Sequence, residues 1–310
     1  MEEPGGGEHE PVLMDQVLDV LAIRADGFYV DATFGRGGHA GAILGRLGEE
    51  GRLLAIDRDP EACAAASQRF AGDPRVRVEQ ARFADLARLV APGSAQGILF
   101  DLGVSSPQLD DARRGFSFLR DGPLDMRMDP RGGESAADFI ARADEREIAT
   151  VISRFGEERH ARRIARAIVA ARAAAPIATT GRLAQVAAAA VPGREPGRHP
   201  ATRTFQALRI HVNDELGEIE RALPQAVAAL APRGRLVVIS FHSLEDRIVK
   251  RFLRAAAREA PEWAGMPDVP SDARARLKLV SRAVFADEAE VRRNPRARSA
   301  VLRAAERTAA

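Results

Sequence analysis

A glycine-rich turn between a strand and a helix places the tightest limit on the fold of this chain. Residues 30–44 read VDATFGRGGHAGAIL, in which an apolar strand leads into clustered glycines and then into a helical pattern. Glycine lets the backbone approach a ligand closely, and the first turn of the following helix has N–H groups without intrahelical partners. The pattern predicts a ligand at the start of this helix, and two cofactors fit it: a nicotinamide dinucleotide and S-adenosylmethionine.

The sequence around this turn alternates between strand and helix patterns. Strand patterns cover residues 28–34, 52–57, 75–81 and 97–103, with helical patterns between them, one of which begins at Pro60. Proline is favoured in the first turn of a helix, and strands that alternate with helices form a parallel sheet covered on both faces. We therefore predict an α/β fold with a Rossmann-like, doubly wound sheet.

The alternation stops after residue 103. Residues 104–134 are rich in proline and glycine, and residues 135–190 are helical in pattern and rich in alanine. A strand pattern returns at 234–241, and we expect residues 277–285 and 299–307 to close the sheet as a hairpin pair. These shifts indicate a sheet that is interrupted by a mainly helical insertion.

The domain boundaries follow from the same shifts. We expect a sheet domain formed by residues 1–105 and 202–310, and an inserted helical domain formed by residues 106–201. The segment PGREPGRHP, at 192–200, is expected to be a linker or an exposed loop because proline and glycine interrupt regular structure.

Composition excludes several classes of protein. Cys63 is the only cysteine, which excludes a disulfide framework, and the sequence contains no HExxH motif or Cys/His cluster for a metal. No apolar run reaches the roughly 18 residues that a membrane span needs. The acidic N-terminal segment also lacks the pattern of a signal peptide. We expect a cytoplasmic protein with no metal and no membrane association.

Positive charge is unevenly distributed along the chain. Residues 151–212 hold eleven arginines and three glutamates without aspartate or lysine, whereas the whole chain has a formal net charge of only +2. Arginine binds phosphate through paired N–H groups and stacks on bases. The clustering favours a polyanionic partner, and a general preference for arginine over lysine is the alternative.

The glycine-rich turn alone does not choose between the two cofactors. Gly35, Gly37 and Ala40 match the dinucleotide pattern GxGxxA, and Asp57 ends the next strand, where an acid binds ribose hydroxyls. Asp31, on the strand before the turn, favours the methyl donor because a carboxylate there would repel a pyrophosphate. S-adenosylmethionine carries an ammonium and a sulfonium and has no phosphate.

Asp101 ends the fourth predicted strand, in FDLGVSSPQ. Ligands of doubly wound sheets lie at the carboxyl ends of the strands, where amino-group methyltransferases usually have an acid or an amide. An exocyclic amine is a poor nucleophile because its lone pair is delocalised into the ring, and an acceptor bonded to its N–H helps to localise that pair. We predict that Asp101 is catalytic, with a capping or turn role as the alternative.

Long motifs along nearly the whole chain resemble one family. They include DATFGRGGHA (31–40), AIDRDP (55–60), DLGVSSPQLD (101–110), GPLDMRMD (122–129), HPATRTFQALRIHVNDEL (199–216) and ISFHSLEDRIVK (239–250). Together they are similar to the ribosomal RNA small subunit methyltransferase H family. The resemblance implies a class I methyltransferase fold and N4-methylation of a decoding-centre cytosine of 16S rRNA, position 1402 in the usual rRNA numbering, with S-adenosylmethionine as donor.

The resemblance also implies the cofactor contacts. They are Gly37, Gly38, His39, Asp57, Phe83, Asp101 and Gln108. Phe83 would lie beside the adenine, and a core aromatic is an equal alternative for it. His39 is expected to contact the methionyl end or to cap the helix rather than to act as a base.

One departure concerns the target base. The DLGVS segment lacks the two prolines and the aromatic residue that usually follow the acid in amino-group methyltransferases. A stacking face would therefore come from elsewhere, with four candidates: Phe116, Phe118, Phe205 and Phe241.

The inserted domain is expected to bind the RNA. Sequence-specific RNA recognition uses unstacked bases, and an enzyme that modifies a base must take it out of the stack. The expected substrate contacts are Arg159, Arg163, Arg166, His199 and Arg203, of which the first three are expected to share one helix face. A solvated face paired with Glu157 and Glu158 is the alternative. The implied partner is 16S rRNA within the small subunit, and the protein is expected to be a monomer or a homodimer.

Transfer is expected to be direct, with the cytosine N4 attacking the methyl group and no covalent enzyme intermediate. Two rival functions remain. A NAD-dependent oxidoreductase would bind a nicotinamide cofactor, which Asp31 disfavours. A non-catalytic RNA-binding assembly factor would keep its RNA binding and lose no activity after Asp101→Ala.

Overall fold

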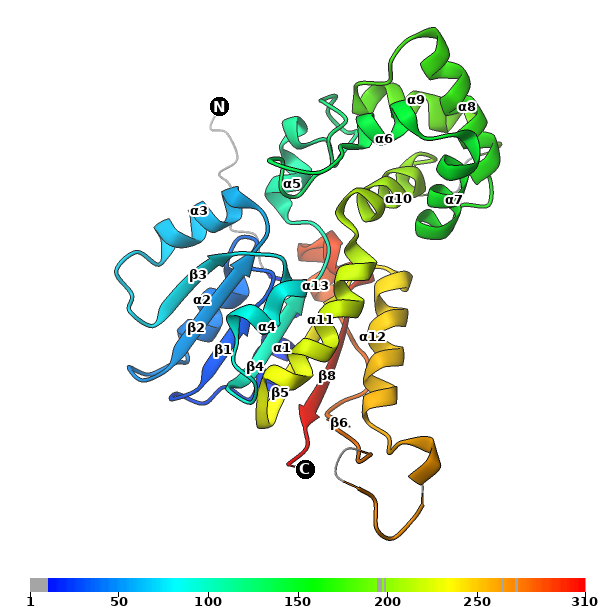
Figure 1. The fold of residues 1–310 in the computed structure, drawn as a ribbon. Helices are drawn as coiled ribbons and strands as arrows, with labels where there is room; N and C mark the ends of the chain where they lie inside the picture. The colour runs from blue at the N-terminus through cyan, green and yellow to red at the C-terminus, as the bar shows by residue number, and fades with distance from the viewer. Residues whose placement is uncertain (1–10, 194–196, 198, 264, 271–272, 310) are drawn as a thin grey trace. The chain divides into compact units, whose positions relative to one another are not determined.

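The computed structural model describes residues 11–193, 197, 199–263, 265–270 and 273–309. The chain divides into two compact units (Figure 1). The sheet unit comprises residues 1–103 and 216–310, and the helical unit comprises residues 104–215.

One mostly parallel sheet forms the centre of the sheet unit. Its strand order is β3-β2-β1-β4-β5-β8-β6, and β7 also pairs with β8. Strands β1 to β5 are parallel, whereas β8 runs antiparallel to β5, β6 and β7. The strands are β1 (Phe28–Asp31), β2 (Arg52–Asp57), β3 (Val76–Gln80), β4 (Ala95–Asp101), β5 (Leu230–Ser240), β6 (Leu277–Leu279), β7 (Val284–Phe285) and β8 (Val301–Arg307). The predicted doubly wound α/β fold is confirmed.

Helices cover both faces of this sheet (Figure 1). One face packs against α4 (Leu86–Leu89), α11 (Glu215–Ala229) and α12 (Ser243–Ala256), and the other against α1 (Met14–Leu21), α2 (Gly38–Leu44), α3 (Pro60–Arg69) and α13 (Glu288–Arg293). Strand β2 shows why: Leu53 and Ala55 belong to one core, and Leu54 and Ile56 belong to the other. Side chains alternate along a strand, so an uninterrupted apolar run is buried on both sides.

The order of the strands reverses between β1 and β4. Strands β2 and β3 extend the sheet on one side of β1, and β5 extends it on the side of β4. Doubly wound sheets bind their ligands at the carboxyl ends of the strands beside such a reversal. Asp31, Asp57 and Asp101 are the last residues of β1, β2 and β4. The topology therefore brings three carboxyl groups to the ligand-binding end of the sheet.

The C-terminal part of the sheet differs from the prediction. The segment expected as one strand at 277–285 forms two short strands, β6 and β7, because residues 280–283 bend between them. Both pair antiparallel with β8, but α13 and a 3-10 helix (Pro295–Ser299) intervene before β8. The three strands therefore do not form a simple hairpin.

The helical unit has one apolar core of its own. It is built from α6 (Ala136–Arg142), α7 (Glu145–Gly156), α8 (Ala161–Ala174), α9 (Thr180–Ala190) and α10 (Thr202–Asn213), preceded by α5 (Ser106–Asp110) and a 3-10 helix (Ala112–Arg114). The structure differs from the predicted boundary at residue 201, because Phe205 and Leu208 of α10 pack into the helical core with Phe139. The helix expected from 202 to 230 is interrupted by Asp214, whose φ of 49° ends α10.

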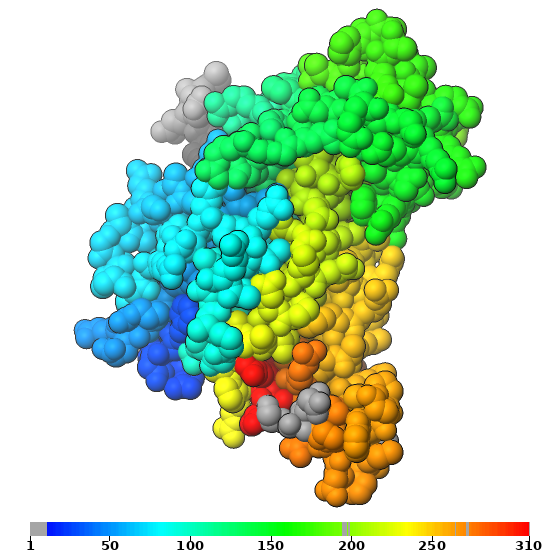
Figure 2. Space-filling view, in the orientation of Figure 1, coloured from blue at the N-terminus to red at the C-terminus, as the bar shows by residue number. Residues whose placement is uncertain are grey.

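A surface segment follows α12 in the sheet unit. The space-filling view shows it in orange, and most of its described residues between 257 and 270 are exposed (Figure 2). Among its described side chains Val269 is buried, with 9% of its surface exposed. No helix in the described parts of the chain has the length and apolar composition that crossing a bilayer requires.

Candidate active site

His39 and Asp101 form the polar centre of the sheet unit's carboxyl end. His39 Nδ1 lies 3.5 Å from Asp101 Oδ2, and His39 Nε2 lies 3.0 Å from the carbonyl oxygen of Val12. A carbonyl can only accept, so Nε2 carries a proton, and the carboxylate favours a second proton on Nδ1. Burial lowers the pKa of His39, but its hydrogen bond to Asp101 and the charges of Asp101 and Asp31 outweigh burial, so the net pKa is raised. The arrangement favours an imidazolium.

The second oxygen of Asp101 has no partner among the residues that the structure describes. Oδ2 faces His39, and the backbone N–H of Asp101 donates to Thr33 Oγ1 at 2.6 Å, but Oδ1 is buried and makes no hydrogen bond to any described residue. A buried acceptor without a donor costs about 1–3 kcal/mol. An oxygen left in this state at the ligand-binding end of a sheet indicates that a ligand N–H or O–H completes it.

Asp31 is fully buried beside this pair. Its side chain is 1% exposed, and Oδ1 accepts a hydrogen bond from the backbone N–H of Thr33 at 3.1 Å. Burial raises the pKa of Asp31 to about 7, against the opposing effect of the His39 charge. The carboxyl group of Asp31 is therefore only partly ionised at neutral pH. Its charge depends on what is bound beside it.

Asp57, the last residue of β2, is hydrogen-bonded to the glycine-rich turn. Oδ2 accepts from the backbone N–H of Gly35 at 2.9 Å, and Oδ1 accepts from that of Asp59 at 2.9 Å. Burial raises the pKa of Asp57, although backbone hydrogen bonds from Asp59, Gly35 and Arg58 oppose this rise. A carboxylate has about four lone-pair sites, so about one remains for a further donor. The predicted ribose contact stays a prediction.

The glycines of the turn lie where side chains do not fit. Gly37 caps α2 with φ +71°, and a Cβ built there would lie 2.3 Å from Cζ of Phe34. A Cβ on Gly38 would lie 2.2 Å from Cγ of Pro11. The N-cap and the first residue of α2 are thus packed closely against Phe34 of the turn and Pro11 of the N-terminal segment.

The remaining predicted cofactor residues have structural roles as well. Phe83 is half-buried and meets Phe100 edge to face, with ring centroids 5.6 Å apart. Gln108 belongs to the helical unit, is 5% exposed, and accepts from the backbone N–H of Ser105 at 3.0 Å in the capping box of α5. Cofactor contact stays a prediction for both residues.

Two of the predicted substrate residues, Arg163 and Arg166, lie on α8, apart from the other three. Arg163 and Arg166 are exposed on α8, and Arg166 lies 3.6 Å from Glu145. Arg159 does not share their helix face as predicted, because Glu157 ends α7 in a left-handed conformation and α8 begins only at Ala161. Arg159 lies in the turn between the two helices.

The other predicted substrate residues meet Arg159 at one cavity. Arg159, His199 and Arg203 all line it. Glu158, which was considered as a partner of the α8 arginines, pairs instead with Arg203, at 3.6 Å between Oε2 and Nη1. Arg159, His199 and Arg203 come together because of the path that the chain takes between α7 and α8 and into α10. Sequence spacing does not predict this path.

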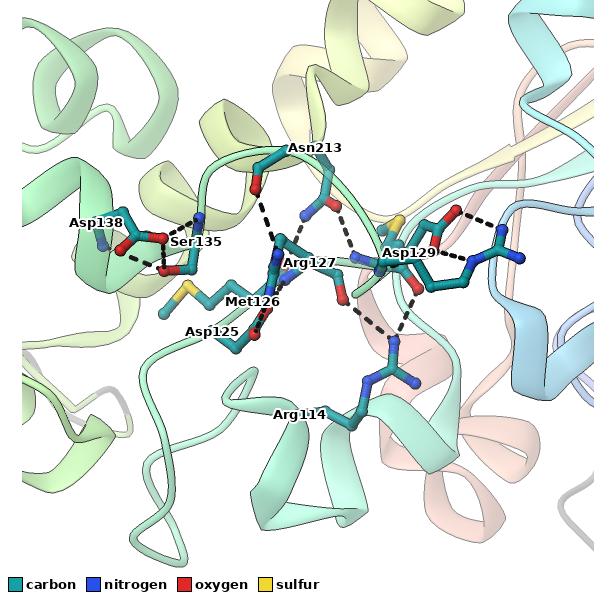
Figure 3. Close-up of polar contacts among 11 residues, drawn as sticks. Arg114, Asp125, Met126, Arg127, Asp129, Ser135, Asp138 and Asn213 are labelled. Carbon is teal, nitrogen blue, oxygen red and sulfur yellow. Dashed lines mark hydrogen bonds and ion pairs between the residues drawn. The ribbon is translucent and has the colours of Figure 1, made fainter.

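A buried amide that sequence reasoning missed orders the GPLDMRMD motif (Figure 3). Asn213 Oδ1 accepts from the N–H of Met128 at 2.8 Å, and Nδ2 donates to the carbonyls of Met126 and Arg209 at 2.7 and 2.9 Å. Arg114 adds donations to the carbonyls of Arg127 and Met128. The only sequence signal was that Asn213 lies in a family-like motif.

Removing this amide should destabilise the protein. Asn213 is 2% exposed, so Asn213→Ala leaves the Met128 N–H and the Met126 carbonyl buried without partners. We expect a loss of about 2–4 kcal/mol in the free energy of unfolding, measured by urea denaturation. Gln185→Ala, which removes an exposed amide from α9, should change it by less than about 0.5 kcal/mol. Equal effects of the two variants would show that the Asn213 hydrogen bonds do not order the motif.

The similarity to known proteins extends over both units of the chain. The sequence profile of the MraW methylase family matches residues 6–308. A curated protein from Thioalkalivibrio sulfidiphilus is 58% identical over 307 residues, covering 97% of this chain and 98% of its own length. One from Halorhodospira halophila is 58% identical over 311 residues, covering 99% and 96%. Both relatives are named ribosomal RNA small subunit methyltransferase H.

Proposed function

Because this chain belongs to the MraW methylase family, we propose that it methylates N4 of a decoding-centre cytosine of 16S rRNA, position 1402 in the usual numbering. It is an rRNA methyltransferase that uses S-adenosylmethionine, in keeping with the names of its relatives. The small ribosomal subunit is its proposed partner, and the cytoplasm, where ribosomal subunits are made, is its proposed location. Its proposed oligomeric state is a monomer or a homodimer.

The observation that carries the proposal is the unpartnered Oδ1 of Asp101. An exocyclic amine such as N4 of cytosine offers two N–H donors and needs an acceptor in the site. Asp101 ends β4, next to the glycine-rich turn that follows β1. A donor N–H and a methyl donor can therefore meet at the reversal of the strand order.

The acids around this point suit a cationic methyl donor. Asp31, Asp57 and Asp101 lie at the ends of neighbouring strands, and His39 contacts Asp101 and interacts electrostatically with Asp31. S-adenosylmethionine supplies an electrophilic methyl group on a sulfonium. A positive ligand is stabilised by carboxylates in a partly desolvated site, whereas a pyrophosphate is repelled.

We assign the steps of the reaction to the chain's own residues. Asp101 Oδ1 accepts an N–H of the cytosine amine, which localises the nitrogen lone pair and directs it at the methyl carbon. His39 holds Oδ2, so the carboxylate cannot rotate away from the amine. The nitrogen forms a bond to the methyl carbon as the carbon–sulfur bond breaks, and the extra proton on nitrogen passes to Asp101 or to water. Positioning alone can contribute about 7–11 kcal/mol.

Under this proposal the seven predicted cofactor residues divide by role. Gly37 and Gly38 give backbone access, Asp57 binds the ribose and Phe83 contacts the adenine. His39 acts through Asp101 rather than by touching the cofactor, which departs from its predicted contact because both ring nitrogens are already engaged. Gln108 is proposed as a further cofactor contact.

The direct test uses small subunits that lack the modification. They are incubated with purified enzyme and methyl-labelled S-adenosylmethionine, and the nucleosides of the digested rRNA are separated. We expect label in N4-methylcytidine from one position of 16S rRNA. Label in another nucleoside would refute the N4 specificity, and no label would refute methylation of this substrate.

The charge of Asp31 gives a prediction about pH. Its carboxylate form binds a cationic ligand better, and its pKa of about 7 means that the ionised fraction grows as pH rises. The dissociation constant of S-adenosylmethionine, which carries the sulfonium, should therefore fall roughly eightfold between pH 6 and 7.5, measured by calorimetry.

Asp31→Asn is the control for this pH dependence. The groups that face Asp31 electrostatically are His39, Asp101 and Asp57, and they remain in the variant. We expect the variant to lose most of the slope while keeping its fold. A slope that is unchanged in Asp31→Asn would assign the dependence to those neighbours instead.

A further inference from the structure

One peptide group joins the carboxylate of Glu290 to the imidazole of His39. The Val12–Leu13 peptide bond is trans, and both of its polar atoms have buried partners. The N–H of Leu13 donates to Glu290 Oε1 at 2.7 Å, and the carbonyl oxygen of Val12 accepts from His39 Nε2 at 3.0 Å. A peptide group is planar and rigid, so the direction of its N–H fixes the direction of its carbonyl. All four residues belong to the sheet unit.

The backbone of Leu13 is strained next to this peptide. Leu13 has φ 54° and ψ 36°, in the left-handed region, and its side chain is fully buried at the start of α1. A residue other than glycine stays in this region only where its surroundings hold it there. The hydrogen bond to Glu290 is one such restraint, and the packing of Leu13 in the core is another. Without the hydrogen bond the peptide can rotate, which turns the Val12 carbonyl away from His39.

Glu290 is itself fixed by its own helix. It is 8% exposed, and its backbone N–H donates at 2.7 Å to the side chain of Asp287, which caps α13. Its backbone carbonyl accepts from the N–H of Asn294 at 2.7 Å, and Val291 packs into the same core as Leu13. The carboxylate of Glu290 therefore reaches Leu13, 277 positions away along the chain, from an anchored helix.

The chain of hydrogen bonds continues to the acid of the candidate active site. His39 Nδ1 lies 3.5 Å from Asp101 Oδ2. Burial lowers the pKa of His39, whereas its hydrogen bond to Asp101, the charges of Asp101 and Asp31 and its hydrogen bond to Val12 raise that pKa. A carboxylate that accepts from the peptide N–H makes the carbonyl a stronger acceptor, because hydrogen bonds in a chain polarise one another. Glu290 thus favours the doubly protonated ring, whose second proton faces Asp101.

We propose that Glu290 is a positioning residue for methyl transfer: it holds the Val12–Leu13 peptide, the peptide fixes the His39 ring, and the ring fixes the carboxylate of Asp101. Glu290 acts through the peptide and the ring rather than on a ligand. This inference deepens the proposed function and rests on the role given there to Asp101. It assigns to the C-terminal helix α13 a part in the geometry of the reacting groups.

The test compares two glutamates of α13. Glu290→Ala removes the acceptor of the Leu13 N–H, and Glu288→Ala removes an exposed carboxylate from the same helix. For methylation of unmodified small subunits, Glu290→Ala should lower kcat about 10- to 100-fold, as a displacement of about 1 Å at a reacting group can do. The Kd of S-adenosylhomocysteine should change less than about threefold. Glu288→Ala should leave both constants near their wild-type values.

Glu290→Gln separates positioning from a general loosening of the segment. The amide oxygen of glutamine still accepts from the Leu13 N–H, so the peptide stays in place although the charge is gone. We expect Glu290→Gln to keep kcat within about threefold of the wild-type value. Should Glu290→Ala not fold, Glu290→Asp takes its place, because it keeps the charge but is too short to reach the peptide, and the same loss of kcat is expected.

A second readout follows the ring itself and needs no substrate. The pKa of His39 is measured by NMR on the full-length protein with isotope-labelled histidine, and His39→Gln identifies its signal. The charged groups that face the ring are Asp101, Asp31 and, through Asp31, Asp57, and they are the same in every Glu290 variant. A weaker acceptor disfavours the imidazolium, so the pKa should fall by at least about half a unit in Glu290→Ala and by less in Glu290→Gln.

Three results would overturn the proposal. The first is a folded Glu290→Ala variant with wild-type kcat and an unchanged pKa of His39. The second is an equal loss of kcat in Glu290→Ala and Glu288→Ala. The third is a loss of cofactor affinity in proportion to kcat, or a Glu290→Gln variant as slow as Glu290→Ala, since either indicates a loosened segment. If the wild-type enzyme labels no cytosine, the proposed function fails, and the NMR titration still decides whether Glu290 acts on His39.

Discussion

Replacing Asp101 with asparagine is expected to lower kcat for methyl transfer by about 10²–10⁴-fold. His39 Nδ1 donates toward the Oδ2 position, so an asparagine there turns its carbonyl oxygen to His39 and its NH₂ toward the substrate. The cytosine amine would then face a donor instead of the unpartnered Oδ1. The affinity for S-adenosylhomocysteine should change at least tenfold less than kcat.

The controls for this prediction separate catalysis from charge and from folding. Asp19→Asn removes an exposed carboxylate from α1 in the same unit and should leave kcat unchanged. Asp101→Ala should be as inactive as Asp101→Asn, since neither provides an acceptor at Oδ1. An asparagine variant with more than a tenth of the original kcat would show that the carboxylate is not needed, and the catalytic assignment of Asp101 would be abandoned.

Gly37→Ala is expected to weaken cofactor binding about 100-fold and to lower the free energy of unfolding by about 2–4 kcal/mol. Gly37 has φ +71°, which an alanine adopts only with strain, and its Cβ would lie 2.3 Å from the ring of Phe34. Phe34 is buried, with 4% of its surface exposed, so its ring cannot move without disturbing the core. The turn must shift instead, and with it the first residues of α2.

Gly72→Ala is the matched control for the glycine variant. Gly72 has φ +82°, but a Cβ there would meet nothing within 4 Å. The two variants share the backbone strain and differ in the clash, so Gly72→Ala should cost only about 1 kcal/mol and leave cofactor affinity unchanged. Calorimetry with S-adenosylhomocysteine and urea denaturation measure both effects. Equal losses in the two variants would mean that close packing of the turn is not what the site requires.

The parallel strands of the central sheet were predictable from the sequence because they are apolar or alternating runs of the right length between turn residues. Strand β2 was predicted to the residue, and Pro60 marked the start of α3, whose cap is the side chain of Asp59. The end of the helical unit was not predictable in the same way. The amphipathic pattern of α10 would be the same whether the helix packed on the sheet or on the other helices. Only the contacts of Phe205 and Leu208 assign it to the core of the helical unit.

The candidate site, too, was predictable only in part. The three acids at the strand ends followed from topology, because parallel strands bring their carboxyl ends together. The state of those acids did not follow, since burial raises the pKa of Asp31 to about 7 and sequence gives no measure of burial at a strand end. The contacts of His39 with Val12 and Asp101 join residues from distant parts of the chain, so no local sequence pattern predicts them.

The central claim is that the carboxyl end of β1, β2 and β4 binds a sulfonium-type methyl donor, and calorimetry tests it most directly. S-adenosylhomocysteine and NAD⁺ are titrated separately into the wild-type protein and into Asp57→Ala. We predict one site for S-adenosylhomocysteine, an affinity at least about tenfold weaker in Asp57→Ala, and no heat of binding with NAD⁺. Tight binding of NAD⁺ without binding of S-adenosylhomocysteine would contradict the account.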